Sequence, residues 1–241
     1  MTLHFYNQNN SPFTMFKLFK EFYIIKLFPK SYPFYKKIFC NVLFFFSRII
    51  IHQRENELSS KDLLKANLLL RKGDIVLCGE HETILSLLIH DPVNHAAIYV
   101  GKRRFVEAIG KGVEYVSFHK LFTAYHSLVI LRAAKGTKRI IIRNAVKFAK
   151  STVGQPYNYE FLQKGEGYFC SQLVNEAYRS AGYNTNLTSI SLARTTRKRL
   201  EEKLSKAADA LRPARMVKGN FRIIFVSHNL KLKGKKLFTK K

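Results

Sequence analysis

Three side chains in this sequence of 241 residues could together carry out nucleophilic catalysis: Cys170, His95 and Glu107. A cysteine attacks as its thiolate, and two features lower the pKa of a thiol, namely a helix N-terminus and a neighbouring imidazolium. Cys170 follows the glycine-rich stretch 165–167, and the residues from 171 to 178 have helical periodicity. We therefore expect Cys170 to open a helix. A lone cysteine at such a position more commonly packs than reacts, so the case depends on its partners.

Two polar residues upstream are the candidate partners. His95 begins an apolar strand, and Glu107 stands inside another, 105–109. A carboxylate within a buried strand is costly unless it is paired. If the turn between the two strands has an odd number of residues, His95 and Glu107 lie on the same sheet face and can touch diagonally. A carboxylate on one ring nitrogen would turn the other nitrogen toward the thiol. The alternative is that Glu107 pairs with Arg104 or Lys111 on an edge strand.

The elements that would position these residues follow from periodicity and turn residues. We expect a helix capped by Ser59 or Ser60 and running to Leu70, followed by a run of strands, two helices and one returning strand. The expected strands cover 74–78, 95–100, 104–108, 112–118, 127–132 and 221–226, and the expected helices cover 137–152 and 170–181. This order predicts an α+β fold with an antiparallel sheet packed against helices.

Both ends of the chain differ in composition from this middle part. We expect an apolar, basic, helical extension over 1–57, a catalytic domain over 58–230, and a basic, frayed C-terminal tail over 231–241. Pro29 and Pro33 should break the extension into two helices. Its longest apolar run, Ile38 to Ile51, is shorter than the roughly 18–20 residues of a bilayer span. No clear signal peptide or full transmembrane span is therefore expected, which leaves a peripheral membrane or a cytoplasmic location.

The net charge of +26 is typical of a protein with an anionic partner, and the alternative is a soluble protein with a basic tail from a lysine-rich proteome. The basic excess is concentrated in residues 194–241, which hold 16 Lys/Arg against 3 acidic residues. We expect residues 13–51 and the basic C-terminus to contact an anionic membrane surface. The alternative is that the aromatic N-terminal segment is a cap packed on the catalytic domain. No ordered nucleic-acid motif accompanies the charge, so no specific nucleic acid is expected.

The number and spacing of the cysteines argue against a disulfide-rich protein and against a zinc site built on thiolates. Three cysteines without a CxxC pair are too few for a disulfide framework and do not form a thiolate zinc site. We expect no metal and no cofactor.

Five motifs occur in an order that resembles the YaeF/YiiX family of permuted papain-like amidases, within the NlpC-type superfamily. They are Gly73-Asp-Ile-Val-Leu, His95-Ala-Ala-Ile-Tyr-Val-Gly, Phe105-Val-Glu-Ala, Gly154-Gln-Pro-Tyr-Asn and Tyr168-Phe-Cys-Ser-Gln-Leu-Val. The histidine precedes the cysteine, as the circularly permuted branch requires. The resemblance implies Cys170 as nucleophile, His95 as base and Glu107 as the third polar residue. It also suggests that Tyr157 lines the substrate pocket. This sequence departs from the family pattern at Gln172, where the family often has Glu.

Three functions remain open from the sequence. The first is a cysteine-dependent hydrolase that cleaves an amide bond, of peptide or peptidoglycan type, through a thioester acyl-enzyme. The second is a lipid acyl hydrolase or acyltransferase on a membrane surface, which the apolar N-terminus suits, although the Asn-Cys-Glu-His-Phe motif of the lecithin–retinol acyltransferase group is absent. The third is a non-enzymatic, basic membrane or nucleic-acid binder on the same fold.

Overall fold

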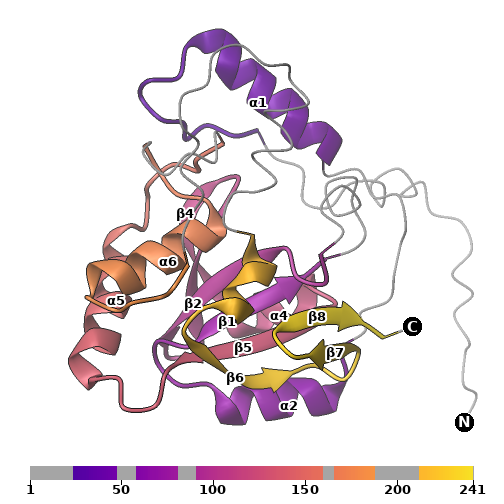
Figure 1. Cartoon of the computed structure of the whole chain (residues 1–241). Helices are drawn as coiled ribbons and strands as arrows, with labels where there is room; N and C mark the ends of the chain where they lie inside the picture. The colour runs from indigo at the N-terminus through magenta and orange to yellow at the C-terminus, as the bar shows by residue number, and fades with distance from the viewer. Residues whose placement is uncertain (1–23, 48–57, 81–90, 160–165, 188–211, 241) are drawn as a thin grey trace, which may run out of the picture.

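A six-stranded antiparallel sheet forms the centre of the molecule (Figure 1). The computed structural model describes residues 24–47, 58–80, 91–159, 166–187 and 212–240. Along the sheet the strands run in the order β4-β3-β2-β1-β5-β6, and every neighbouring pair is antiparallel. The strands are β1 Ile75–Gly79, β2 His95–Gly101, β3 Arg104–Ile109, β4 Gly112–Ser117, β5 Ser127–Ala133 and β6 Phe221–Val226. All six lie where the hydrophobic pattern predicts them.

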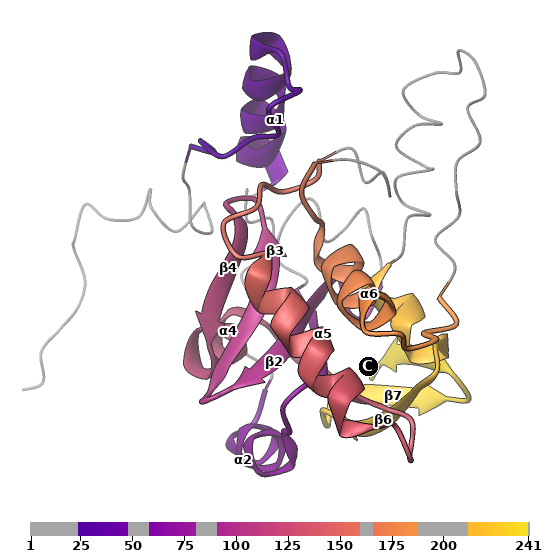
Figure 2. The same ribbon diagram turned by 90° about the vertical axis from the view of Figure 1, so that its left-hand side faces the viewer.

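Helices cover both faces of the sheet. On one face lie α5, Arg139–Ser151, and α6, Cys170–Ser180, as Figure 2 shows. The other face is covered by α2, Ser60–Leu69, and by the short α4, Phe118–Ala124. Each face has its own apolar core, because successive residues of a strand point to opposite sides. The expected α+β fold, an antiparallel sheet packed against helices, is confirmed.

Polar contacts, as well as packing, fix the start of α2 and the start of β1. Ser59 caps α2 by accepting a hydrogen bond from the backbone N–H of Asp62, whose carboxylate accepts one in return from the Ser59 backbone. At the start of β1 the buried Asp74 binds Arg132 of β5 through two hydrogen bonds of 2.7 Å. This bidentate pair joins β1 to β5 at the end of the sheet that faces α2.

The N-terminal extension is described only from residue 24 onward. It contains one helix, α1, Phe34–Ser47, which begins directly after Pro33 as the proline rule predicts. Residues 24–33 are not helical, and the rest of the region expected to form another helix lies outside the described residues. Among the helices described, none has the length and apolarity needed to cross a bilayer. Figures 1 and 2 place α1 at one end of the molecule and α2 at the other.

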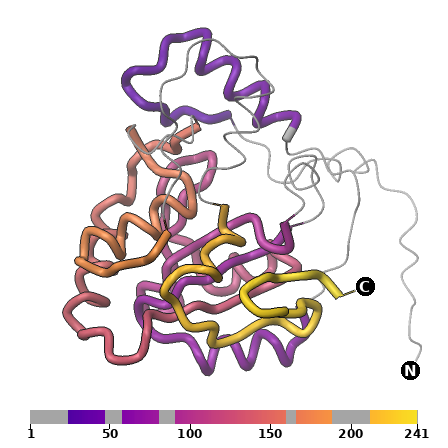
Figure 3. Tube along the Cα trace, in the orientation of Figure 1, coloured from indigo at the N-terminus to yellow at the C-terminus, as the bar shows by residue number. Residues whose placement is uncertain are grey.

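The C-terminal residues differ from expectation. The sequence predicted a frayed basic tail from Lys231, whereas β7, Leu230–Lys233, and β8, Lys236–Thr239, form a hairpin. In the tube drawing it is the yellow loop that leads to the C-terminus (Figure 3). The prediction was wrong because the lysines hid an alternating pattern, in which Leu230 and Leu237 join the main core while the lysines face water.

Candidate active site

His95 and Glu107 meet across the β2–β3 pair. Glu107 lies directly opposite Ala97, so His95, two residues before Ala97, is its diagonal neighbour on the same face. The His95 Nε2 is 2.7 Å from a carboxylate oxygen of Glu107. Both residues are buried, with exposed fractions of 7% for His95 and 4% for Glu107. The carboxylate therefore holds one ring nitrogen of the imidazole in a nearly dry environment.

The shared face depends on a β-bulge. The turn between β2 and β3 has two residues, Lys102 and Arg103, both in the left-handed conformation of a type I′ hairpin turn. The register shifts between Tyr99 and Gly101, so β2 contains one residue more than β3 does. The bulge supplies the odd residue that the sequence argument required. Without it, Glu107 would point to the opposite face from His95.

Cys170 is the first residue of α6, as expected. Phe169 is the N-cap residue, and its backbone N–H donates to the Oε1 of Gln172 at 3.3 Å. The same oxygen accepts from the side-chain amide of Asn158 at 3.3 Å. Gln172 thus closes one half of a capping box and fixes the point at which the chain enters the helix. The family that the sequence resembles often has Glu at this position. The side-chain amide of Gln172 keeps the capping role and lacks the negative charge of Glu.

The Cys170 thiol reaches the imidazole of His95. The two side chains are hydrogen bonded, and because Nε2 is taken by Glu107, Nδ1 is the nitrogen left for the sulfur. Burial alone would raise the pKa of Cys170, but the hydrogen bond with His95, its positive charge and the backbone N–H groups of Ala96 and Ser171 lower that pKa. The arrangement therefore favours a thiolate.

The electrostatics of His95 complete the pair. Burial would lower the pKa of His95, but its hydrogen bonds with Cys170 and Glu107 and their negative charges raise it to about 10. A lowered thiol pKa and a raised imidazole pKa both favour a thiolate–imidazolium ion pair. The edge-strand alternative, in which Glu107 pairs with Arg104 or Lys111, does not describe this site.

Tyr125 is a member of the site that the sequence analysis missed. Its ring stacks on the imidazole of His95 with ring centroids 5.3 Å apart and an angle of 4° between the planes. Burial raises the pKa of its hydroxyl well above the ordinary value, and the charge of Glu107 adds to this. Tyr125 follows α4, a helix that was not expected.

The other cysteines and Tyr157 lie in different surroundings. Cys78 is directly opposite His95 on β1, but it is fully buried, and that burial raises its pKa well above the ordinary value. Cys40 is buried on α1. Tyr157 forms an isolated backbone bridge with Tyr168, two residues before Cys170, and its ring packs edge-on against Tyr159. Its expected contact with substrate stays a prediction.

A polar hollow of about 500 Å³ lies beside the first turns of α6. Gln172, Tyr168 and Glu176 are among its lining residues, whereas Cys170, His95 and Glu107 are not. We therefore do not take this hollow as the site of the chemistry. Within the described part of the chain, no group of three or more His, Cys, Asp or Glu side chains is placed to hold a metal ion.

Comparison with known proteins gives the family. The model of the permuted papain-like amidase enzymes YaeF/YiiX, the C92 peptidase family, matches residues 69–219. One similar solved structure is that of the metalloprotein YiiX from Escherichia coli O157:H7. Its TM-score is 0.53 at 17% identity, over 66% of this chain and 98% of the other, a likeness that supports the fold. No curated protein matches the chain. The family match spans more than half of the sequence and includes all three residues of the site, so the chain belongs to the permuted papain-like amidase family YaeF/YiiX.

Proposed function

We propose that the chain cleaves an amide bond through a covalent thioester on Cys170, with His95 as base and acid and Glu107 as the residue that orients it. The observation that carries this proposal is the position of the His95 imidazole, hydrogen bonded to Glu107 on one side and to Cys170 on the other. Nucleophile, base and orienting group within hydrogen-bond reach are the shared feature of such sites. The amidase family gives the class of bond.

The chemistry follows from these positions. The Cys170 thiolate attacks the carbonyl carbon, and the electron pair moves to the oxygen, which becomes an oxyanion. The Cys170 backbone N–H, one of the unpaired donors at the start of α6, supplies a hydrogen bond to that oxygen. His95 then gives its Nδ1 proton to the leaving nitrogen, the C–N bond breaks, and an amine departs. Water, deprotonated by the now neutral His95, attacks the thioester and releases a carboxylic acid and the thiolate.

The substrate we propose is an amide of peptide or peptidoglycan type. A lipid acyl hydrolase or acyltransferase remains the second candidate, and the exposed apolar side chains of α1 favour it. In that case the same thiolate attacks an ester carbonyl, and the leaving group is an alcohol. The intact set of Cys170, His95 and Glu107 is the reason to rank a non-enzymatic basic binder last.

The description of the similar solved structure raises the question of a metal. The similar Escherichia coli structure is described as a metalloprotein. Among the residues that the structure describes in this chain, no three metal-binding side chains lie together. The reaction proposed above is written with protein side chains and water.

The test compares wild type with Cys170→Ala and His95→Gln on matched amide, thioester and phospholipid substrates. We expect amide turnover to be lost in both variants, because one lacks the nucleophile and the other lacks the base. The phospholipid arm separates the two candidate substrates. Amide turnover by Cys170→Ala at the wild-type rate would contradict the proposal.

A further inference from the structure

The helix α1 exposes a row of large apolar side chains to solvent. Seven large apolar side chains of α1 are at least 46% exposed, and Phe34 reaches 78%. They are Phe34, Tyr35, Ile38, Phe39, Val42, Leu43 and Phe46. Their spacing of three and four residues places them on one broad, continuous face of the helix. A contiguous apolar patch of this kind marks a binding surface.

The segment 24–28 forms a single unit with α1. The side chain of Asn41 accepts a hydrogen bond from the Ile25 backbone N–H at 2.7 Å and donates one to the Ile25 carbonyl at 3.2 Å. Between segment and helix runs an apolar groove of about 530 Å³, lined by Ile25, Phe28, Ile38 and Val42 among others. We call residues 24–47 the docking unit. Its groove is apolar enough to accept a lipid acyl chain.

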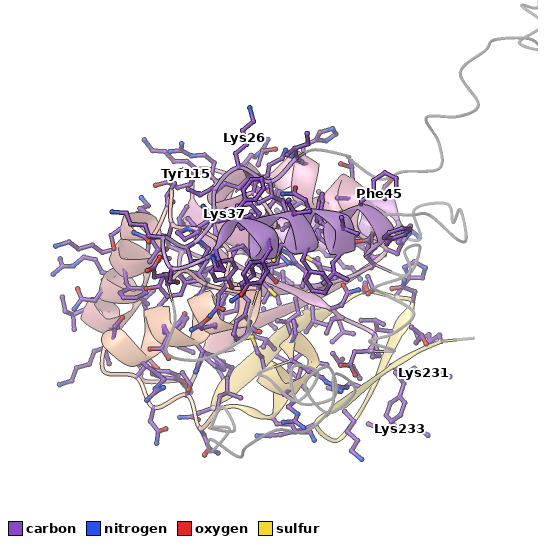
Figure 4. All side chains as sticks on the ribbon, turned by 90° about the horizontal axis from the view of Figure 1, so that it is seen from above. Lys26, Lys37, Phe45, Tyr115, Lys231 and Lys233 are labelled. Atoms are coloured by element: carbon purple, nitrogen blue, oxygen red, sulfur yellow. The ribbon has the colours of Figure 1, made fainter. Side chains whose placement is uncertain are left out.

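The positive charge of the docking unit indicates an anionic partner. Residues 24–47 contain four lysines, Lys26, Lys30, Lys36 and Lys37, and no acidic residue. Broad apolar faces flanked by lysine are the pattern of helices that lie in the interface of an anionic bilayer. Seen from above in Figure 4, α1 lies across the top of the molecule, with Lys26 and Lys37 toward one end and Phe45 toward the other.

The docking unit is attached to the two segments that flank the catalytic centre. On one side Leu27 packs over Gly112, since a Cβ at Gly112 would meet its side chain at 2.8 Å. Gly112 pairs with Ile109, the β3 residue two positions beyond Glu107. His95 lies two positions before Ala97, the partner of Glu107, and so belongs to the same row of the sheet. With strands about 4.8 Å apart, Gly112 lies about 10 Å across the sheet from His95.

On the other side the docking unit contacts the segment that leads into Cys170. The ring of Phe28 is 5.9 Å from that of Tyr159, which in turn packs against Tyr157. The backbone N–H of Lys30 donates to the carboxylate of Glu166, four residues before Cys170. The docking unit is thus fixed at the catalytic end of the sheet, while α2 lies at the opposite end of the molecule (Figures 1 and 2).

We propose that the docking unit seats the catalytic end of the protein on an anionic bilayer, so that Cys170 acts on amide or ester bonds held at the membrane surface. Only the part of this inference that concerns the action of Cys170 rests on the proposed cysteine chemistry. Docking itself follows from the exposed apolar face, the four lysines and the attachment beside His95 and Cys170. A substrate with its reactive carbonyl at the level of the lipid head groups fits this placement.

Binding is tested by co-sedimentation of Cys170→Ala with vesicles of phosphatidylglycerol and phosphatidylcholine. We expect Ile38→Ser/Phe39→Ser to weaken binding about tenfold per residue, because each side chain is removed from water in the bilayer. The matched control is Leu64→Ser/Leu68→Ser on α2, where both leucines are exposed, 61% and 74%, at the opposite end. Equal loss in both double variants, or no vesicle binding by the parent protein, overturns the proposal.

The charge contribution is tested in the same assay. Lys26→Gln/Lys37→Gln should weaken binding about fivefold per lysine at low salt, and raised salt should shrink this difference. Lys231→Gln/Lys233→Gln is the control, since Figure 4 shows both lysines away from α1. If the β7 variant loses more affinity than the α1 variant, the basic C-terminus is the docking element and the proposed orientation is wrong.

The orientation of the catalytic site is tested with two electrophiles on the same protein. A lipid with a maleimide head group in anionic vesicles should label Cys170, and Ile38→Ser/Phe39→Ser should abolish that labelling. Soluble iodoacetamide should label Cys170 equally in both, which shows that the site is intact. Vesicle binding without lipid-maleimide labelling of a Cys170 that iodoacetamide does label would overturn the orientation. A Cys170 unreactive to both reagents, with binding retained, would contradict the cysteine chemistry and leave docking supported.

Discussion

Replacing Glu107 with Gln isolates the contribution of its charge to the site. Its carboxylate oxygen lies 2.7 Å from the His95 Nε2, and both side chains are buried. With about 4 Å between the charge centres and an effective dielectric constant near 20, their attraction is about 4 kcal/mol. That energy corresponds to roughly three pKa units. The pKa of His95, about 10 with Glu107 present, should therefore fall to roughly 7 in Glu107→Gln.

The sign of the effect is fixed by linkage. A raised pKa means that the imidazolium persists at neutral pH, so losing the carboxylate removes the proton donor for the leaving nitrogen over the range between about 7 and 10. We expect amide turnover at pH 8 to fall about tenfold, because a group with a pKa of roughly 7 is only about one-tenth protonated at that pH. The fold should be retained, since glutamine has nearly the same shape as glutamate. The measurement is the NMR titration of the His95 Cε1–H signal, assigned by its absence from His95→Gln.

Glu176→Gln is the matched control. Glu176 lies on α6 with Cys170, but it forms an exposed ion pair with Arg179, so its removal should leave the His95 titration unchanged. A His95 pKa that stays near 10 in Glu107→Gln would refute the argument that this carboxylate holds the imidazolium. So would an equal drop in turnover in Glu176→Gln.

Three further changes probe the site and its support. At pH 7 iodoacetamide should alkylate Cys170 faster than Cys78, whose pKa is raised by burial. Mass spectrometry of the peptides measures the two rates, and equal rates would contradict this prediction. Tyr125→Leu should lower turnover about two- to tenfold by removing the ring stacked on His95, and Tyr125→Phe should restore it. A Tyr125→Phe variant as slow as Tyr125→Leu would contradict stacking as the cause. Asp74→Ala should lower the free energy of unfolding in urea by about 3 kcal/mol, because it removes the carboxylate that pairs with the charge of Arg132. A cost under about 1 kcal/mol would show that the pair matters little.

The central part of the fold could be predicted from the sequence because its patterns are strong. The strands from Ile75 to Ala133 are almost entirely apolar where they are buried, and β-strands of that kind need no tertiary information to be recognised. The site followed from the same patterns, because His95 and Glu107 are polar residues in apolar strands. What the sequence left open was the parity of their separation, which the bulge near Val100 decides.

The features that were missed depend on contacts between distant residues. The hairpin β7–β8 has only one deeply buried side chain in each strand, Leu230 and Leu237, so its lysines dominated the local pattern. The short helix α4 is only seven residues long, too short for its periodicity to stand out. Tyr125 enters the site because that helix ends beside His95, and no local rule brings those two rings together.

The most direct test of the central claim is to trap the acyl group on the enzyme. Rapid acid quench of wild type with an amide substrate, followed by peptide mass spectrometry, should find the acyl mass on the peptide that contains Cys170. Hydroxylamine should remove that mass, as expected of a thioester, and His95→Gln should accumulate none. Amide cleavage with no acyl adduct on Cys170, and with the rate unchanged in Cys170→Ala, would contradict the account.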